Sequence, residues 1–415
     1  MTRVFGIHNL ALAEDVTQDA FCRALEVWKF RGVPANPSAW LMGTAKNRAL
    51  DVLRRERMAR IFAPELERRF EDEVNLEPAF EGLFEESAIK DDRLRMMFLC
   101  CEPRLPEKAQ VALVLHLVCG FGIAEVAGAF VTTKAAVEKR IERAKQELTQ
   151  GTAPFDIANA ADFAARLPAV QRALYLLFNE GYHGASAESA VRVELCREAI
   201  RLGALLCAHR LAATPASHAL VALMYLHAAR LPGRIDAGGD LASLCDQDRS
   251  RWNPRLVAEG RRLLDLSAMG CELSAYHIEA GIAAVHADAQ SIEHTDWQQI
   301  VWLYDTLLAI APSGIVALNR AIAVGQLAGP KRGLAEIDAI AEPKRLAAYP
   351  FYFAAHGEFE LKSGGAARAR EHFEVAAALA RNPMERHFFE QRVAACVDWR
   401  DPAPRAPILN INRVN

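Results

Sequence analysis

Apolar residues recur at intervals of three and four along almost the whole chain, whereas alternating runs rich in Val, Ile and Thr are missing. The first pattern is typical of helices with one buried face, and the second would indicate half-buried strands. The chain is therefore predicted to be all-α. Its 415 residues exceed an ordinary single domain, so we expect about two or three domains, separated where proline and glycine cluster.

The cysteines and the apolar runs indicate where such a chain resides. Nine cysteines are scattered through apolar helical stretches, which is typical of reduced thiols and not of a disulfide framework. The longest apolar run, Val111 to Cys119, is interrupted by His116 and is too short to span a bilayer. The N-terminus also lacks the pattern of a secretory signal. We therefore expect a cytoplasmic protein with no membrane contact.

Motifs that carry catalysis or bind metals are missing from the sequence. There is no His-Glu-x-x-His helix, no Cys-x-x-Cys pair and no Gly-x-Ser-x-Gly. The glycines and the lysine between Gly325 and Lys331 lack the spacing of a phosphate loop, and the twelve histidines are dispersed. We expect no enzymatic activity, no metal and no cofactor.

The net charge of −3 conceals three strongly charged blocks in the N-terminal third. Residues 29–60 contain eight basic side chains against two acidic ones, whereas residues 70–92 contain nine acidic side chains against one lysine. Residues 132–145 are basic again, with a net charge of +3. Two basic helices are therefore predicted to flank an acidic tether, and a whole-chain charge says little about partners.

The first basic block lies on a helix that is predicted to begin after Pro37. Ser38 is suited to cap this helix, and apolar residues from Ala39 to Leu53 form a stripe along one side. The other side is cationic, which suits a polyanion because each neutralised phosphate releases counterions. The alternative is a basic face that is merely solvated, and this helix by itself does not decide between the two.

The segment ahead of this helix makes the pattern recognisable. It reads Leu12-Ala13-Glu14-Asp15-Val16-Thr17-Gln18-Asp19-Ala20-Phe21 and has an exposed acidic and amide edge. Leu12 to Arg60 resembles region 2 of the extracytoplasmic-function sigma factors of bacterial RNA polymerase, whose pattern is an Ala-Glu-Asp opening, Val-x-Gln-Asp/Glu-x-Phe, a loop, and Trp-Leu with a run of Arg. The resemblance implies a helical bundle that binds both polymerase and promoter DNA.

In that family the Gln-Asp/Glu helix docks on the clamp helices of the polymerase β′ subunit, and the loop and basic helix that follow open the minus-ten element. The resemblance thus assigns core-polymerase contacts to Asp15, Gln18 and Asp19. It assigns contacts with minus-ten DNA to Arg31, Asn36, Trp40, Lys46, Asn47, Arg48, Arg54 and Arg55. For Trp40 a core role stays open, because tryptophan in a short apolar stretch is more often packed than a stacking platform for an unpaired base.

One departure from the family concerns the start of the chain. The family normally has another helix or so ahead of the acidic opening, whereas this chain begins shortly before it. An N-terminal truncation is therefore an open expectation. It bears on polymerase binding more than on the fold.

The second basic block fits a helix-turn-helix, whose second helix lies in the major groove. Ile123 to Phe130 is predicted as a short helix and Lys134 to Leu148 as a longer cationic one, with Ala135, Ala136, Val137, Ile141 and Ala144 toward the core. Such patterns produce many false positives. Here the position of the segment after region 2 favours a genuine helix-turn-helix. Phe98 to Leu148 resembles region 4 of the same sigma factors, which reads the minus-thirty-five element and holds the polymerase β-flap. The resemblance implies DNA contacts by Thr132, Thr133, Lys134, Lys139, Arg140 and Arg143.

The acidic tether, residues 70–92, has two interpretations. A charge run is usually a solvated linker, and that is the interpretation we favour. In the sigma family, however, the linker threads polymerase channels that otherwise hold nucleic acid, so mimicry of RNA charge is the alternative.

The remaining two thirds of the chain are predicted to be helical and lack strong charge blocks. Leu174 to His183 combines aromatic and polar groups, and a packed helix ending at Gly181 is favoured over a pocket. Near the end, Phe353, Gly357, Ala369, Phe373, Ala376 and Pro383 have the spacing of a tetratricopeptide unit. A weaker copy precedes it at Leu318, Ala323, Ala335 and Ile337. Upstream helices such as Trp297 to Ile310 are expected to complete a solenoid with a concave face for a peptide or protein.

The complete layout resembles the sigma factors that carry a long tetratricopeptide-like extension, in which the extension is thought to regulate the sigma portion in place of an anti-sigma factor. The expected domains are region 2 (1–69), the acidic linker (70–92), region 4 (93–150), a helical extension (155–290), tetratricopeptide-like repeats (291–400) and a tail (401–415).

The function implied is a sigma factor that directs RNA polymerase core enzyme to promoters, with a regulatory C-terminal domain. Two alternatives stay open: a peptide- or protein-sensing helix-turn-helix regulator that acts without polymerase core, and a tetratricopeptide-like scaffold. A regulator would bind its operator alone, and a scaffold would show no salt-dependent DNA binding.

Overall fold

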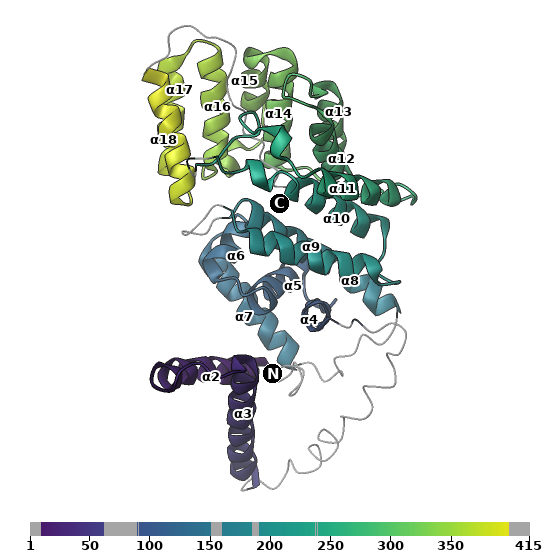
Figure 1. The fold of residues 1–415 in the computed structure, drawn as a ribbon, viewed down its shortest axis with the longest axis vertical. Helices are drawn as coiled ribbons and strands as arrows, with labels where there is room; N and C mark the ends of the chain where they lie inside the picture. Colours follow the sequence, from purple (N-terminus) through teal and green to yellow (C-terminus); the bar gives the residue numbers. More distant parts are fainter. Residues whose placement is uncertain are drawn as a thin grey trace. The chain divides into compact units, whose positions relative to one another are not determined.

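The computed structural model describes residues 10–61, 89, 91–150, 160–184, 191–236, 238 and 240–397, and these residues are predominantly helical (Figure 1). Within these ranges no strand forms, and the only β-bridge pairs Ile235 with Leu241. The prediction of an all-α chain is thus confirmed. Nearly all of the acidic tether and the whole of the tail 401–415 lie outside the described residues.

The chain divides into two compact units, residues 1–114 with 138–166 and residues 115–137 with 167–415. The first unit begins with a hairpin of α2 (Leu10–Arg31) and α3 (Pro37–Ile61). Small side chains let these helices approach closely, because their shared core consists of Val16 and Ala20 on α2 with Ala45 and Ala49 on α3.

The turn between α2 and α3 is fixed by local backbone chemistry. Gly32 has a φ of +75° and donates its N–H to the carbonyl of Trp28 at 3.0 Å, so it ends α2 in a conformation that favours glycine. The Asn36 side-chain oxygen accepts the Ala39 N–H at 3.0 Å, which makes Asn36 the cap. Pro37 occupies the first helical position. The expectation that Ser38 caps this helix was wrong by two residues, because Asn36 is also a strong capping residue.

The helix-turn-helix segment contains four α-helices. They are α4 (Asp92–Cys100), α5 (Glu107–Leu113), α6 (Ile123–Ala129) and α7 (Lys134–Gln150). Asp91 caps α4 by accepting the Leu94 N–H at 2.9 Å, and the Glu125 carboxylate accepts the Gly122 N–H at 2.8 Å at the start of α6. A π-helical turn, Val114–Val118, follows α5.

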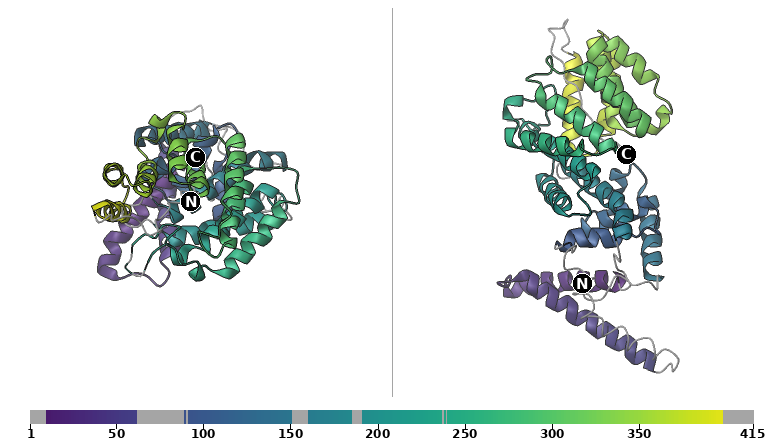
Figure 2. Two further views of the ribbon diagram at one scale, coloured as in Figure 1. Left: turned by 90° about the horizontal axis from the view of Figure 1, so that it is seen from above. Right: turned by 90° about the vertical axis from the view of Figure 1, so that its right-hand side faces the viewer.

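The C-terminal helices lie in order along the chain. They are α8 (Ala160–Tyr182), α9 (Val193–Ala208), α10 (Pro215–Ala228), α11 (Pro254–Ser267), α12 (Ala275–Asp288), α13 (Trp297–Ile310), α14 (Gly314–Ala328), α15 (Pro330–Asp338), α16 (Pro350–Lys362), α17 (Ala366–Ala378) and α18 (Pro383–Val397). From α9 onward each helix contacts the next one, and α16, α17 and α18 stand side by side (Figure 2). Packing between sequence neighbours is the arrangement of a solenoid.

Close helix pairs explain the pattern that predicted tetratricopeptide units. A Cβ atom at Gly357 of α16 would lie 2.8 Å from the ring of Phe373 on α17, so only glycine permits this approach. Ala369, Phe373 and Ala376 are buried, as are Leu318 and Ala323 of the weaker copy, whereas Ala335 is exposed. The helix pairs fit the predicted repeat, and their assignment to that repeat family stays a prediction.

The expected end of a helix at Gly181 was wrong. α8 continues to Tyr182, and Gly181 serves a close contact instead, because a Cβ atom there would lie 2.7 Å from the backbone nitrogen of Cys196. The residues after α8 also contact the residue that precedes α18, since the Asn382 side chain donates to the carbonyl of Gly184 at 3.1 Å.

A buried carboxyl in this domain makes stability depend on pH. Glu279 of α12 is almost fully buried and accepts a hydrogen bond from the Tyr175 hydroxyl at 2.9 Å. Burial raises the pKa of Glu279 to about 7. The folded chain therefore takes up a proton as the pH falls through about 7, whereas the unfolded chain does so only near 4.5.

We expect Glu279→Gln to be more stable than the natural chain at pH 8 by roughly 2–3 kcal/mol, because the charged form is no longer buried. The advantage should shrink as the pH falls from 8 to 5, where the natural carboxyl is neutral too. Thermal unfolding at both pH values measures this, with exposed Glu272→Gln as the control. An advantage that does not change with pH would contradict the raised pKa.

Candidate nucleic-acid interface

One face of α2 carries the residues predicted to bind polymerase. Asp15, Gln18 and Asp19 are all exposed, whereas the adjacent Val16 and Ala20 are buried. Their spacing of three and four residues places them on a common side of the helix. That side is acidic and polar, and it is open to a partner.

Two large apolar side chains extend this face. Phe21 is 54% exposed and Leu25 is 76% exposed, and they follow Gln18 at helical spacing. Neighbouring exposed apolar groups of this size are typical of protein-binding surfaces. Sequence reasoning missed both residues, because a helix pattern alone does not tell which of its apolar residues stay exposed.

An ion pair joins a residue predicted to bind polymerase to one predicted to bind DNA. Arg48 of α3 donates its Nε–H to the Asp19 carboxylate at 3.0 Å, and both side chains are about half exposed. An exposed pair of this kind contributes little, about 0–1 kcal/mol. It can therefore open at small cost when either side chain meets a partner.

The exposed surface of α3 is cationic. Lys46, Asn47 and Arg48 are all exposed: Asn47 points away from the buried Ala45 and Ala49, and Lys46 and Arg48 flank them. Arg31, at the end of α2, is exposed as well. Arg54 and Arg55 lie within the helical span of α3, but their side chains are outside the described part of the chain.

Trp40 and Asn36 both have structural partners. The ring of Trp40 meets that of Trp28 edge to face, with 5.4 Å between their centroids, and Trp40 is half-buried. Asn36 is exposed, and its side-chain oxygen caps α3. Each therefore helps to hold the α2–α3 turn, and their contacts with DNA stay predictions.

The turn into α7 positions the second cationic helix. Thr132 donates its N–H to the Ala127 carbonyl at 2.9 Å, and the Thr133 hydroxyl accepts the Ala136 N–H at 3.3 Å. Val131, between the two helices, has a φ of +49°, which is an uncommon conformation for a β-branched residue. Hydrogen bonds on the C-terminal side of Val131 thus fix where α7 begins.

The buried stripe of α7 determines which side chains point outward. Val137, Ile141, Ala144 and Leu148 are buried, as expected for the first three. Of the predicted DNA contacts, Thr133, Lys134, Lys139 and Arg143 are exposed, and Thr132 and Arg140 are partly buried.

The expectation that Ala135 and Ala136 face the core was wrong, since both are exposed. The helical period places them with Lys139 and Arg143, opposite the buried stripe. Two alanines on a cationic face let a helix approach a groove closely, and an alanine methyl can contact a thymine methyl.

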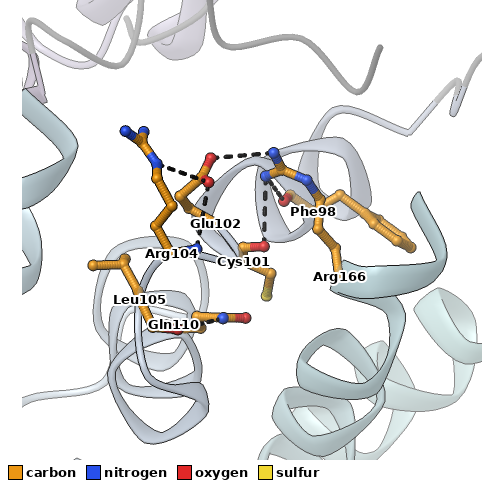
Figure 3. A network of polar contacts seen from close by, with 7 residues as sticks. All are labelled: Phe98, Cys101, Glu102, Arg104, Leu105, Gln110 and Arg166. Atoms are coloured by element: carbon orange, nitrogen blue, oxygen red, sulfur yellow. Dashed lines mark hydrogen bonds and ion pairs between the residues drawn. The ribbon is translucent and has the colours of Figure 1, made fainter. Parts of the chain in front are cut away.

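A buried polar network supports the corner between α4 and α5 (Figure 3). Arg166 of α8 has a side chain only 6% exposed and donates to the carbonyls of Phe98 at 3.2 Å and Cys101 at 3.5 Å. It also pairs with the Glu102 carboxylate at 3.2 Å. The arginine thus supplies side-chain donors to carbonyls at the end of α4. Beside it, Phe163 stacks on Phe98 with 4.3 Å between ring centroids.

Other kinds of site find little support in the described ranges. Within them, no group of three His, Cys, Asp or Glu side chains is arranged to hold a metal ion. None of the described helices is long and apolar enough to cross a membrane.

Comparison with known proteins identifies three segments. Residues 3–58 match the family described as Sigma-70 region 2, residues 95–148 match Sigma-70, region 4, and residues 166–268 match a family of unknown function (DUF6596). An uncharacterized protein of Rhizobium meliloti (strain 1021) is 37% identical over 385 residues, which cover 93% of this chain and 90% of that protein. No solved structure matches the chain.

The Arg166 network can be tested by a matched pair of variants. Arg166→Met should lower the free energy of unfolding by about 2–4 kcal/mol, because it removes three hydrogen bonds and leaves a partly buried carboxylate without its buried partner. Arg104 pairs with the same Glu102 carboxylate at 3.1 Å but is 56% exposed, so Arg104→Met should cost less than about 1 kcal/mol. Urea unfolding of the full chain measures both. Equal losses would show that burial does not distinguish the two contacts.

Proposed function

We propose how this chain works from one premise: it belongs to the sigma-70 family, as a sigma factor of the extracytoplasmic-function type with an additional C-terminal domain. Sigma factors direct RNA polymerase to promoters, so RNA polymerase core and promoter DNA are its partners. The family is not enzymatic. The observation that carries this conclusion is the presence of regions 2 and 4, in that order, on one chain.

For polymerase binding, we assign the exposed face of α2 to the clamp helices of the β′ subunit. Asp15, Gln18 and Asp19 provide its polar contacts, and Phe21 and Leu25 provide apolar area beside them. An apolar patch with a polar rim is the usual composition of a protein interface. The weak Asp19–Arg48 pair supports the assignment, because it leaves Asp19 available at small cost.

For the minus-ten element, the support is the basic outer face of α3 and the turn before it. The proposed contacts are Arg31, Asn36, Trp40, Lys46, Asn47, Arg48, Arg54 and Arg55. Cationic side chains hold the phosphates, and an aromatic ring can stack on an unpaired base. The packing of Trp40 against Trp28 makes stacking on DNA the least supported role in this set.

For the minus-thirty-five element, the support is the exposed face of α7. The proposed contacts are Thr132, Thr133, Lys134, Lys139, Arg140 and Arg143, and we add Ala135 and Ala136 because both are exposed. A recognition helix of this kind lies in the major groove. Region 4 is also proposed to hold the polymerase β-flap.

The C-terminal domain is proposed to regulate the sigma portion. Its stacked helices fit a surface for a peptide or protein partner. The domain boundaries given above and the location in the cytoplasm belong to the same proposal.

Transcription by reconstituted polymerase tests the function directly. Core enzyme with the full chain should produce transcripts from fragmented genomic DNA whose 5′ ends share promoter elements, and core enzyme alone should not. A chain ending at Tyr182, which keeps α8 with Phe163 and Arg166 against Phe98, should support the same starts if the C-terminal domain only regulates. Operator binding by the chain alone, with no effect on the core enzyme, would instead favour a regulator that works without polymerase.

The assignment of α7 can be tested on a promoter found in this way. Replacing both Lys139 and Arg143 by Ala should weaken the binding of holoenzyme to DNA by about the same factor whatever the sequence of the minus-thirty-five element. It should also reduce the slope of log binding constant against log salt concentration by about two. The control replaces Arg104 and Lys108, which are exposed near the start of α5, by Ala. A salt slope that falls equally in both double variants would remove Lys139 and Arg143 from the interface.

A further inference from the structure

Three arginines gather inside the C-terminal domain. Arg230 and Arg234 flank the 3₁₀ turn after α10 and are 2% and 8% exposed, and Arg249 lies on a second 3₁₀ turn ahead of Trp252. Arg230 and Arg249 lie over the ring of Trp252, at 5.3 Å and 5.2 Å from its centroid. Arg234 lies 4.7 Å from the ring centroid of Tyr182, at the end of α8. Two aromatic rings thus hold three guanidinium groups in one place.

These arginines differ from the other buried arginines of the chain. Arg166 pairs with Glu102, Arg381 with Glu385 and Arg392 with Glu358. In contrast, none of the three clustered arginines forms an ion pair with a carboxylate of the described residues. Their recorded partners are the carbonyls of Tyr182, His286 and Ala289, the Thr295 hydroxyl and two imidazole nitrogens.

The concentration of positive charge affects the neighbouring groups. Burial lowers the pKa of Arg230, and the nearby Arg234 lowers it further. Burial and Arg230 lower the pKa of Arg249 to about 10, against a smaller opposing effect of the Glu293 carboxylate. The pKa of His227 also lies well below its ordinary value, because the imidazole is buried and stands beside Arg230 and Arg234. An uncompensated charge at such a site costs free energy unless an anion binds there.

Several donors in the cluster have no hydrogen-bond partner among the described residues. They are the Nε atoms of Arg230 and Arg234, the indole Nε1 of Trp252 and the Tyr182 hydroxyl. All four side chains are more than nine-tenths buried. A buried donor without a partner is costly, and native proteins rarely collect several in one place without a ligand to receive them.

We propose that the cluster of Arg230, Arg234, Arg249, Tyr182 and Trp252 binds the phosphate group of a small molecule. Guanidinium forks match phosphate oxygens in geometry and charge. A carboxylate carries one charge in one plane, whereas a phosphate near its second ionisation carries about −1.5 to −2 and accepts hydrogen bonds from several directions. The donors here come from the end of α8, the turn after α10 and the segment before α11, so they favour a tetrahedral acceptor.

Ligand-dependent stabilisation of the full chain tests the site. Inorganic phosphate and glycerol 3-phosphate are the probes, and chloride and succinate at the same ionic strength are the controls. At a 100-fold excess over its Kd, a phosphate probe should raise the Tm by roughly 3–6 °C, whereas the controls should not. A response to glycerol 3-phosphate alone would indicate a phosphate ester, and a response to both probes would include the free ion. Stabilisation by succinate and not by phosphate would overturn the proposal.

Measurements on variants distinguish a phosphate-binding site from an arginine cluster that only stabilises the fold. Arg230→Gln should keep or raise the Tm without ligand, because it removes a charge that no described carboxylate balances, and it should weaken phosphate binding by about tenfold or more in calorimetry. Arg251→Gln, on the same turn as Arg249 but exposed, should change neither quantity. If Arg230→Gln does not fold, Trp252→Phe removes the indole N–H donor and keeps an aromatic ring, and it should also weaken binding. Full binding by these variants, or no phosphate-induced stabilisation of the natural chain, would overturn the site.

Discussion

Nearly everything in this structure depends on one constraint: without a sheet in the described residues, each helix has to bury its apolar stripe against other helices. In the C-terminal domain the partner is the next helix in sequence, from α9 through α18. Glycines at the tightest contacts allow this, since a Cβ atom at Gly325 or Gly333 would collide with the ring of Phe359. The cores around Phe373 and around Ile300 are built in this way.

Because packing uses one stripe of each helix, the opposite face is left to carry charge. The exposed surfaces of α3 and α7 are basic, and that of α2 is acidic with exposed apolar side chains. Buried arginines form other contacts. Arg166 satisfies the end of α4 and has a carboxylate partner, whereas Arg230 and Arg234 lack one in the described part of the chain. Burial and pairing together are the basis on which we propose a binding role for Arg230 and Arg234 and a structural role for Arg166.

The periodicity of the sequence was enough to predict the all-α class and the inward positions of Val137, Ile141 and Ala144, because these depend on neighbours along one helix. It was wrong at the ends of helices. Asn36 caps α3 in place of Ser38, and Ala135 and Ala136 turn outward in the first turn of α7. Local spacing does not determine where a helix begins when neighbouring residues can both cap it.

What the sequence could not predict are contacts between residues far apart in the chain. Arg166 and Phe98 are separated by 68 positions and Asn382 and Gly184 by 198. The pairing of Trp28 with Trp40, and the assembly of Arg230 and Arg249 on Trp252, likewise depend on turns whose direction no repeat encodes. The assignment of individual residues to DNA and polymerase rests on family resemblance together with the exposure of the side chains.

The central claim is that the two basic modules act together with polymerase core to open promoter DNA. Permanganate reactivity of thymines in a promoter tests this most directly, because permanganate oxidises thymines that have left the duplex. The account predicts reactive thymines around the minus-ten element when core enzyme and the full chain are both present, and none with either one alone. Protection or binding of that promoter without reactive thymines in the presence of both would contradict it.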